Sequence, residues 1–140
     1  MKRPEVPISD ASALVIAVGP EVREFKIGDR VINNFFQKWI DGEPTRELLQ
    51  SSVGAEVEGV LKEYAIFPES GLVRAPKNLS WDEASTLTCA GLSAWSALKG
   101  LGAVKKGDYV LTQGTGGVSL FALQVCESFS STLRIKIHSH

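Results

Sequence analysis

The sequence predicts a mixed β and α/β protein, with a partly open β-barrel over residues 1–78 and the beginning of a doubly wound domain over residues 79–140. Two observations lead to this fold class. Before Pro76, short apolar and β-branched runs alternate with Gly and Pro, which is typical of a barrel or sandwich. After Pro76, a helical pattern is followed by a strand, a glycine-rich turn and a second helix, as at the start of a βαβ unit.

Short strands account for most of the first region. Residues 11–18 are apolar and β-branched and end at a Gly-Pro pair, so we expect a buried strand closed by a turn. A second strand is expected over residues 30–33, and further strand-like segments over residues 59–75. Residues 35–54 have no steady period, which predicts a long excursion of the kind that is usually functional or disordered.

One tight turn occurs twice in the sequence. Lys26-Ile27-Gly28-Asp29 precedes the strand over 30–33, and Lys105-Lys106-Gly107-Asp108 precedes an expected strand over 109–112. In each copy the glycine permits an unusual backbone conformation, and the aspartate can accept a hydrogen bond within its own turn. Because the flanking sequences do not repeat, we interpret this as one turn used twice.

A helix is predicted after Pro76. Ser80 and Glu83 form a capping box, in which each side chain bonds the backbone N–H of the other. Apolar and small residues then recur at spacings of three and four, which predicts one packed stripe. Its members are Ala84, Leu87, Ala90, Gly91, Ala94, Trp95 and Leu98. Gly100 and Gly102 are expected to end the helix.

The strongest signal for a binding site is a glycine-rich turn between the strand over 109–112 and an expected helix over 118–127. A pyrophosphate needs backbone N–H groups that side chains do not cover, and a helix start adds about half a positive charge. The predicted cofactor-binding residues are Gly114, Thr115, Gly116, Gly117, Val118 and Ser119. Ser119 stands where the dinucleotide fingerprint has glycine or alanine, and serine is small enough to fit there. The alternative is a turn that binds nothing.

Composition and charge limit the partners. A net charge of -1 lacks the basic excess that phosphate contacts require, so we expect no nucleic-acid partner. The apolar run over 11–18 is far shorter than a membrane-spanning helix of roughly 20 residues, so no membrane span is expected. Cys89 and Cys126 lie far apart in apolar stretches, which argues against a disulfide framework and fits a cytoplasmic location.

From about residue 6 to residue 124, the sequence resembles the medium-chain dehydrogenase/reductase family. The stretches that carry the resemblance are Pro7-Ile8-Ser9-Asp10 leading to Val18-Gly19-x-x-Val22, then Phe25-Lys26-x-Gly28-Asp29-Arg30-Val31, then Thr88-Cys89-Ala90-Gly91-Leu92-Ser93-Ala94-Trp95, and the glycine-rich turn. The resemblance implies a GroES-like barrel that holds substrate and a Rossmann domain that binds NADP or NAD. It also implies hydride transfer between the nicotinamide and a small carbonyl, quinone, enone or alcohol substrate, and the possibility of a homodimer.

Within this family the sequence is most similar to the zinc-independent branch, which includes quinone and enoyl reductases. Zinc alcohol dehydrogenases have a histidine metal ligand at the position of Ser9, and Cys89 stands at the position of their third ligand. One thiol cannot build a tetrahedral site that needs three protein ligands, and residues 35–54 lack the cysteines of the structural zinc lobe. We therefore expect no zinc and a Cys89 that is only a small buried residue. A zinc alcohol dehydrogenase is the disfavoured alternative.

The catalytic residues are unknown, because no acid–base pair is visible and hydride transfer depends mainly on positioning. Asp10 is either an active-site carboxylate or, as we favour, a turn or ion-pair residue. The aromatic residues Phe35, Phe36 and Trp39 either line an apolar substrate pocket or anchor their loop to the barrel.

The last residues carry weaker signals. Residues 131–138 alternate apolar and charged side chains where a second Rossmann strand should begin, and Arg134 and Lys136 there would favour the phosphate of NADP. His138 and His140 are expected to belong to a solvated tail and not to a metal site.

The resemblance begins after the family's first barrel strands and stops early in its Rossmann domain. We therefore expect a chain truncated at both ends, inactive as a reductase and a weak nucleotide binder by itself. The helix after Gly117 is expected to expose an apolar face formed by Val118, Phe121, Ala122 and Val125. The rival hypothesis is a non-catalytic GroES-like module that serves interaction or dimerisation.

Overall fold

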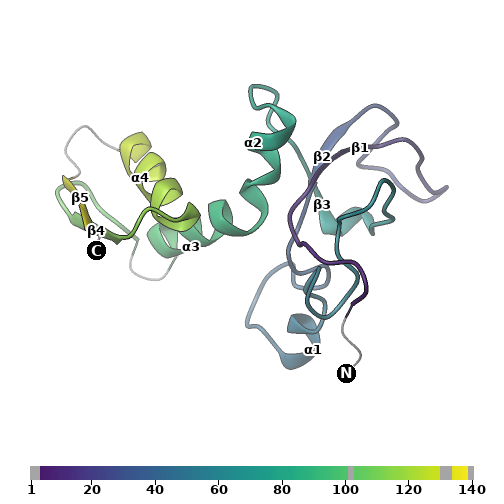
Figure 1. Ribbon diagram of the computed structural model, residues 1–140, viewed down its shortest axis with the longest axis horizontal. Coiled ribbons are helices and arrows are strands. Elements are labelled where there is room, and N and C mark those ends of the chain that lie inside the picture. Colours follow the sequence, from purple (N-terminus) through teal and green to yellow (C-terminus); the bar gives the residue numbers. More distant parts are fainter. Residues whose placement is uncertain (1–3, 101–102, 130–133, 139–140) are drawn as a thin grey trace. The chain divides into compact units, whose positions relative to one another are not determined.

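The computed structural model describes residues 4–100, 103–129 and 134–138, and the chain divides into two compact units, Met1–Cys89 and Ala90–His140 (Figure 1). The first unit contains an antiparallel sheet and the second a parallel strand pair with helices. The predicted combination of mixed strands and helices, with a sheet that does not close, is confirmed. The division of the family domains after residue 78 stays a prediction.

Three short strands form the sheet of the first unit. They are β1 (Ser12–Leu14), β2 (Arg30–Asn33) and β3 (Leu72–Arg74), in the order β1-β2-β3 and all antiparallel. The central strand β2 carries the buried residues Val31, Ile32 and Asn33, and it has the predicted bounds. Ile32 packs with Ala75 and Ala84 in the core of this unit.

The expected buried strand over residues 11–18 is wrong in its extent and its burial. Only Ser12–Leu14 joins the sheet, and Leu14, Ile16 and Val18 are about half exposed. The reason is that β1 is an edge strand, and residues 16–18 run past its pairing with β2 toward an open groove. Residues 59–75 likewise contain β3 as their only described strand, preceded by a 3₁₀ turn at Glu69–Gly71.

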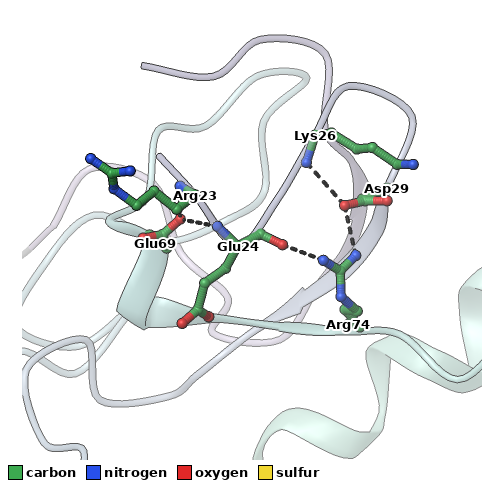
Figure 2. Close-up of polar contacts among 6 residues, drawn as sticks. All are labelled: Arg23, Glu24, Lys26, Asp29, Glu69 and Arg74. Atoms are coloured by element: carbon green, nitrogen blue, oxygen red, sulfur yellow. Dashed lines mark hydrogen bonds and ion pairs between the residues drawn. The ribbon is translucent and has the colours of Figure 1, made fainter. Parts of the chain in front are cut away.

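The first Lys-x-Gly-Asp turn ties β2 to β3 (Figure 2). Within the turn, the Asp29 N–H donates to the Lys26 carbonyl at 3.1 Å, and the Lys26 N–H donates to Asp29 Oδ2 at 3.0 Å. Arg74 of β3 donates to the same Asp29 oxygen at 2.7 Å and also to the Glu24 carbonyl. The Lys26 N–H, and then the Arg74 guanidinium, hold the pKa of Asp29 below its ordinary value.

A second carboxylate secures the segment before this turn. Glu69 Oε2 accepts the backbone N–H groups of Arg23 and Glu24, each at 2.7 Å (Figure 2). The N–H of Glu24, followed by that of Arg23, lowers the pKa of Glu69. Residues 23–29, which include part of the stretch Phe25-Lys26-x-Gly28-Asp29-Arg30-Val31, are therefore held by the side chains of Glu69 and of Arg74 in β3.

The excursion over residues 35–54 has local structure. It contains the short helix α1 (Arg46–Leu49), which is capped by the Thr45 hydroxyl accepting the Leu48 N–H at 3.3 Å. A bridge between Phe36 and Ser52 closes the excursion on itself. The excursion therefore contains defined local structure.

The capping box is confirmed, but the helix after it is interrupted. Ser80 caps α2 (Trp81–Ser85), with the Glu83 N–H donating to Ser80 Oγ at 3.2 Å and the Ser80 N–H donating to Glu83 Oε2 at 2.8 Å. A π-helix at Leu87–Gly91 then precedes α3 (Leu92–Lys99).

This interruption changes the predicted apolar stripe. Ala84, Ala94 and Leu98 are buried as expected. Trp95, in contrast, is half exposed, and the Lys99 Nζ lies 5.7 Å from the centre of its ring. The stripe is divided between two cores, since Ala84 packs with Ile32 and Ala75, whereas Ala94 and Leu98 pack with Ala122 and Cys126. The prediction that Trp95 packs in the stripe is wrong, because half of its surface is exposed.

The second unit contains the predicted strand, turn and helix. Strand β4 (Tyr109–Gln113) is followed by α4 (Gly117–Phe129) and by β5 (Arg134–His138), which pairs with β4 in parallel. The expected second strand is thus confirmed, and the backbone of His138 belongs to it and not to a tail. His140 and Gly102 lie outside the described residues.

Helices α3 and α4 pack on each other through Ala94, Leu98, Ala122 and Cys126, with Phe121 and Val125 against them. The expectation that α4 exposes its apolar face is therefore wrong for these α4 residues, because α3 covers them. It holds for Val118, which is exposed.

Candidate functional site

The glycine-rich turn connects β4 to α4 and brings all six predicted cofactor-binding residues together. Gly114 has a φ of 78°, a conformation that other residues rarely adopt. A Cβ placed on Gly116 would have no heavy atom within 4 Å, so the backbone there is open to a ligand. A Cβ on Gly117 would lie 3.1 Å from the Ala90 Cβ, so this glycine allows close packing of α4 on the π-helix.

Backbone donors are available at this helix start. The Leu120 N–H donates to the Gly116 carbonyl at 3.1 Å, which is the first bond of this kind along α4. The N–H groups of the first helical residues have no partner inside the helix, and their dipoles sum to a positive end. A helix of 13 residues with an uncovered glycine before it can therefore hold an anion such as a diphosphate.

Ser119 fits the turn in a specific way. Its hydroxyl donates to the carbonyl of Gln113, the last residue of β4, at 3.0 Å, which ties the first turn of α4 to the strand. Gly117 makes a different close contact, between the start of α4 and Ala90 of the π-helix. Sequence analysis missed this role, since its partner Ala90 lies on a separate helix.

A second cluster forms around Asp10. Its Oδ2 accepts the backbone N–H of Cys89 at 3.2 Å, and its Oδ1 accepts the hydroxyl of Ser9. Of the two roles considered for Asp10, these contacts favour that of a turn residue that binds backbone. Cys89 is exposed, so the expectation of a small buried residue is wrong, because the π-helix presents it at the surface.

Asn33 is a residue of this cluster that sequence analysis missed. Its side chain is only 3% exposed and holds the peptides on both sides of Asp10. Nδ2 donates to the Ser9 carbonyl at 2.7 Å, and Oδ1 accepts the Ala11 N–H at 2.9 Å. A polar residue ending a buried strand was the available signal, because a buried amide needs partners.

The aromatic residues of the excursion contact one another. Phe35 and Phe36 meet edge to face with ring centres 4.7 Å apart, and Phe36 and Trp39 do so at 5.4 Å. Trp39 Nε1 donates to the Gly42 carbonyl at 3.0 Å. These contacts support the alternative in which the rings anchor their own loop, and the rings do not line the groove described next.

An apolar groove of about 590 Å³ opens in the first unit. Its two long walls are residues 11–19 and 60–67, and Ile66 in the second wall is fully exposed. The lining is mostly apolar, and it also includes the side chains of Lys62, Glu63, Tyr64 and Glu69. Within the described part of the chain, no three His, Cys, Asp or Glu side chains are grouped to hold a metal ion. Nor does any helix there have the length and apolarity to cross a membrane.

Comparison with known proteins decides the family. The profile of the alcohol dehydrogenase GroES-like domain matches residues 1–77, which is more than half of the chain. The chain belongs to this family. The resemblance to medium-chain dehydrogenase/reductase proteins is thereby confirmed, and it agrees with the incomplete sheet of the first unit.

Individual relatives agree with this assignment. A zinc-type alcohol dehydrogenase-like protein of Schizosaccharomyces pombe is 45% identical over 126 residues, which cover 89% of this chain and 36% of the relative. A chloroplast envelope quinone oxidoreductase homolog of Arabidopsis thaliana is 32% identical over 132 residues, covering 90% of this chain and 35% of that protein.

A solved structure extends the likeness to both units. It is a protein of Sinorhizobium meliloti 1021, provisionally described as an alcohol dehydrogenase, and it is 44% identical with a TM-score of 0.87. The match covers 98% of this chain and 40% of that chain. This member of the GroES-like family therefore spans well under half the length of the relatives it matches.

Proposed function

We propose that the chain is part of a nicotinamide-dependent oxidoreductase whose glycine-rich turn binds the pyrophosphate of NADP or NAD. The observation that carries this proposal is the open backbone at Gly116 directly before α4. When bound, the nicotinamide would exchange hydride with a small carbonyl, quinone, enone or alcohol substrate. A structure 32% identical to this chain, with a TM-score of 0.81, is described as an NAD-dependent alcohol dehydrogenase, which supports the cofactor class.

Four residues of the turn have defined roles in this proposal. Gly114 makes the sharp exit from β4, and Gly116 leaves the N–H groups uncovered. Gly117 lets the helix start pack on Ala90, and the Ser119 hydroxyl fixes that start to the end of the strand. The chain thus holds a rigid set of donors for an anion, and rigidity lowers the entropy cost of binding.

We further propose that this protein belongs to the zinc-independent branch of the family. Ser9 stands in place of the histidine ligand and donates its hydroxyl to Asp10, and among the described residues no three His, Cys, Asp or Glu side chains are grouped to hold a metal ion. A catalytic zinc needs three protein ligands. Elemental analysis of the purified chain should find no stoichiometric zinc. One zinc per chain that disappears in Cys89→Ala would contradict this assignment.

The experiment for cofactor binding is an NMR titration of the ¹⁵N-labelled chain with NADPH and with NADH. We expect the amides of residues 114–119 to shift, and we expect Gly116→Val to weaken binding more than tenfold, since removing even one charge-assisted hydrogen bond costs about 1.5 to 3 kcal/mol. Gly116 suits this test because its φ is not positive and a Cβ there would meet nothing within 4 Å.

A matched control is Gly19→Val, which alters a glycine of the first unit whose φ is not positive and whose Cβ would meet only Val22, at 3.9 Å. Its amides at 114–119 should still respond to the nucleotide. Unchanged spectra of the wild-type chain with both nucleotides would return the turn to a purely structural role.

The second candidate function is a non-catalytic interaction or dimerisation module. The apolar groove of the first unit favours it, since large exposed apolar surfaces often mark contact sites. Sedimentation of the chain over a range of concentrations distinguishes the two. Association that is independent of nucleotide, in a chain whose glycine-rich turn ignores NADPH and NADH, would favour this candidate.

A further inference from the structure

Two local irregularities of the backbone are connected by one carboxylate. Among the described residues, Ile8 is the non-glycine residue with a positive φ, 73°, which is an outlier for a β-branched side chain. The π-helix at Leu87–Gly91 is the second irregularity, and such turns often occur at functional sites. Asp10 lies two residues after Ile8 and accepts the N–H of Cys89, which is 79 residues away in the sequence.

Hydrogen bonds from other parts of the first unit fix the segment that carries Asp10. The Val60 N–H donates to the Ile8 carbonyl at 2.8 Å, and a Cβ on Gly54 would lie 2.8 Å from Ile8 backbone atoms. Asn33, which is buried, grips the peptides before and after Asp10. A strained residue such as Ile8 persists only where its surroundings determine its conformation. The segment therefore holds the Asp10 carboxylate in a defined position.

The π-helix is also the covalent junction of the two units. Cys89 is the last residue of the first unit and Ala90 the first residue of the second. Asp10 holds the Cys89 N–H on one side of this peptide bond. On the other side, Ala90 Cβ lies against the position where Gly117 lacks a side chain, beside the glycine-rich turn.

We propose that Asp10 is a positioning residue: it pins the π-helix at the junction and, through it, the contact of Ala90 with Gly117 at the start of α4. Asp10 touches no ligand in this role, and it acts as a hydrogen-bond acceptor and not through its charge. Its effect on cofactor binding rests on the function proposed above, whereas its effect on the junction does not.

The test compares three substitutions in the ¹⁵N-labelled full chain, without nucleotide. In Asp10→Ala the Cys89 amide should exchange with solvent about tenfold faster, because its acceptor is lost, and the Gly117 amide resonance should move. Asp10→Asn should restore both properties, since the amide oxygen can accept the Cys89 N–H while the NH₂ group donates to the Ser9 hydroxyl. Ser9→Ala should leave both near wild type.

Several results would overturn the proposal. Asp10→Asn behaving like Asp10→Ala would show that the charge matters and not the positioning. An unmoved Gly117 resonance in Asp10→Ala would show that the junction does not transmit the change. The Ile32 amide in β2 reports on unfolding of the first unit, to which Cys89 also belongs. Faster exchange at Ile32 to the same degree as at Cys89 would make the effect a loss of stability of the whole unit.

A final measurement separates this inference from the proposed function. NADPH titration of Asp10→Ala should give weaker shifts at residues 114–119 than titration of the wild type. Equal binding by both chains would overturn the functional part of the inference. If the wild type itself gives no shifts, the proposed cofactor function fails, and the measurements without nucleotide still decide whether Asp10 positions the junction.

Discussion

The two Lys-x-Gly-Asp turns have the same internal geometry and different connections. In both, the aspartate N–H donates to the first lysine carbonyl at 3.1 Å, and in both the glycine φ is positive, 93° at Gly28 and 95° at Gly107. In both, the lysine N–H returns a bond to the aspartate carboxylate, at 3.0 Å in the first and 2.8 Å in the second. Only Asp29 also pairs with a distant residue, Arg74, among the described residues.

This comparison separates local from tertiary information. The turn forms in both of its surroundings, because every bond that defines it joins residues three positions apart in the sequence. The surroundings decide what the turn supports. In the first unit it fastens β2 to β3 through Arg74, whereas in the second it only directs the chain into β4.

The largest difference that we predict between the two units is in thiol reactivity. Cys89 is exposed, while Cys126 has no exposed surface, and burial also raises the pKa of its thiol. A thiol reagent should therefore label Cys89 faster by a factor on the order of a hundred, since Cys126 must wait for its unit to open. Mass spectrometry of the peptides after timed labelling measures both rates. Equal rates would mean that the helix pair α3–α4 does not protect its core.

The next prediction uses the glycines of the two turns. Gly28→Ala and Gly107→Ala should each cost about 1 to 2 kcal/mol, because alanine pays for a positive φ while its Cβ meets nothing within 4 Å at either site. The two costs should be equal, since both are purely local. Urea unfolding measures the loss of stability, and the rate of Cys126 labelling shows which unit is affected. Gly107→Ala should speed this labelling, whereas Gly28→Ala should not, because Cys126 and Gly107 lie in the second unit and Gly28 in the first. Very unequal costs would show that the turns are not equivalent.

The features that the sequence predicts correctly are those decided by local contacts. The turns, the Ser80–Glu83 capping box and the succession of β4, glycine turn and α4 all depend on residues within a few positions of one another. Features that depend on distant residues could not be predicted. The Cys89 N–H of the π-helix donates to the Asp10 carboxylate, 79 positions away, and neither the π turn nor the exposure of Cys89 follows from the helical pattern.

The candidate site shows the same division. The six residues of the glycine-rich turn could be predicted together, because the strand, turn and helix that hold them are contiguous. The packing of Gly117 on Ala90 and the grip of Asn33 on the Asp10 segment could not, because each joins separate elements. An apolar pattern also does not reveal whether other residues cover it. The sequence therefore predicts burial of residues 11–18, although Leu14, Ile16 and Val18 are about half exposed.

The smallest effect that we predict isolates the tertiary bond of the first turn. Asparagine can still accept the lysine N–H in either turn, so Asp108→Asn should change stability little at neutral pH. Asp29→Asn should lower it more, because the charge that Arg74 contacts is lost. The difference should be modest, since an exposed ion pair is screened by solvent and salt. Added salt should reduce it further.

Acid titration provides the sign of this effect. The pKa of Asp29 in the folded chain lies below its ordinary value of 3.8, because the ionised form accepts bonds from Lys26 and Arg74. This carboxylate therefore stabilises the fold fully above pH 3.8, and its contribution is lost as the pH falls through the lowered pKa. Wild-type stability, measured by urea unfolding from neutral pH down into this range, should fall more steeply than that of Asp29→Asn. If the unfolding free energies of the two chains fall equally steeply with decreasing pH, the Arg74 bond does not stabilise the ionised carboxylate. The two turns would then contribute equally to stability.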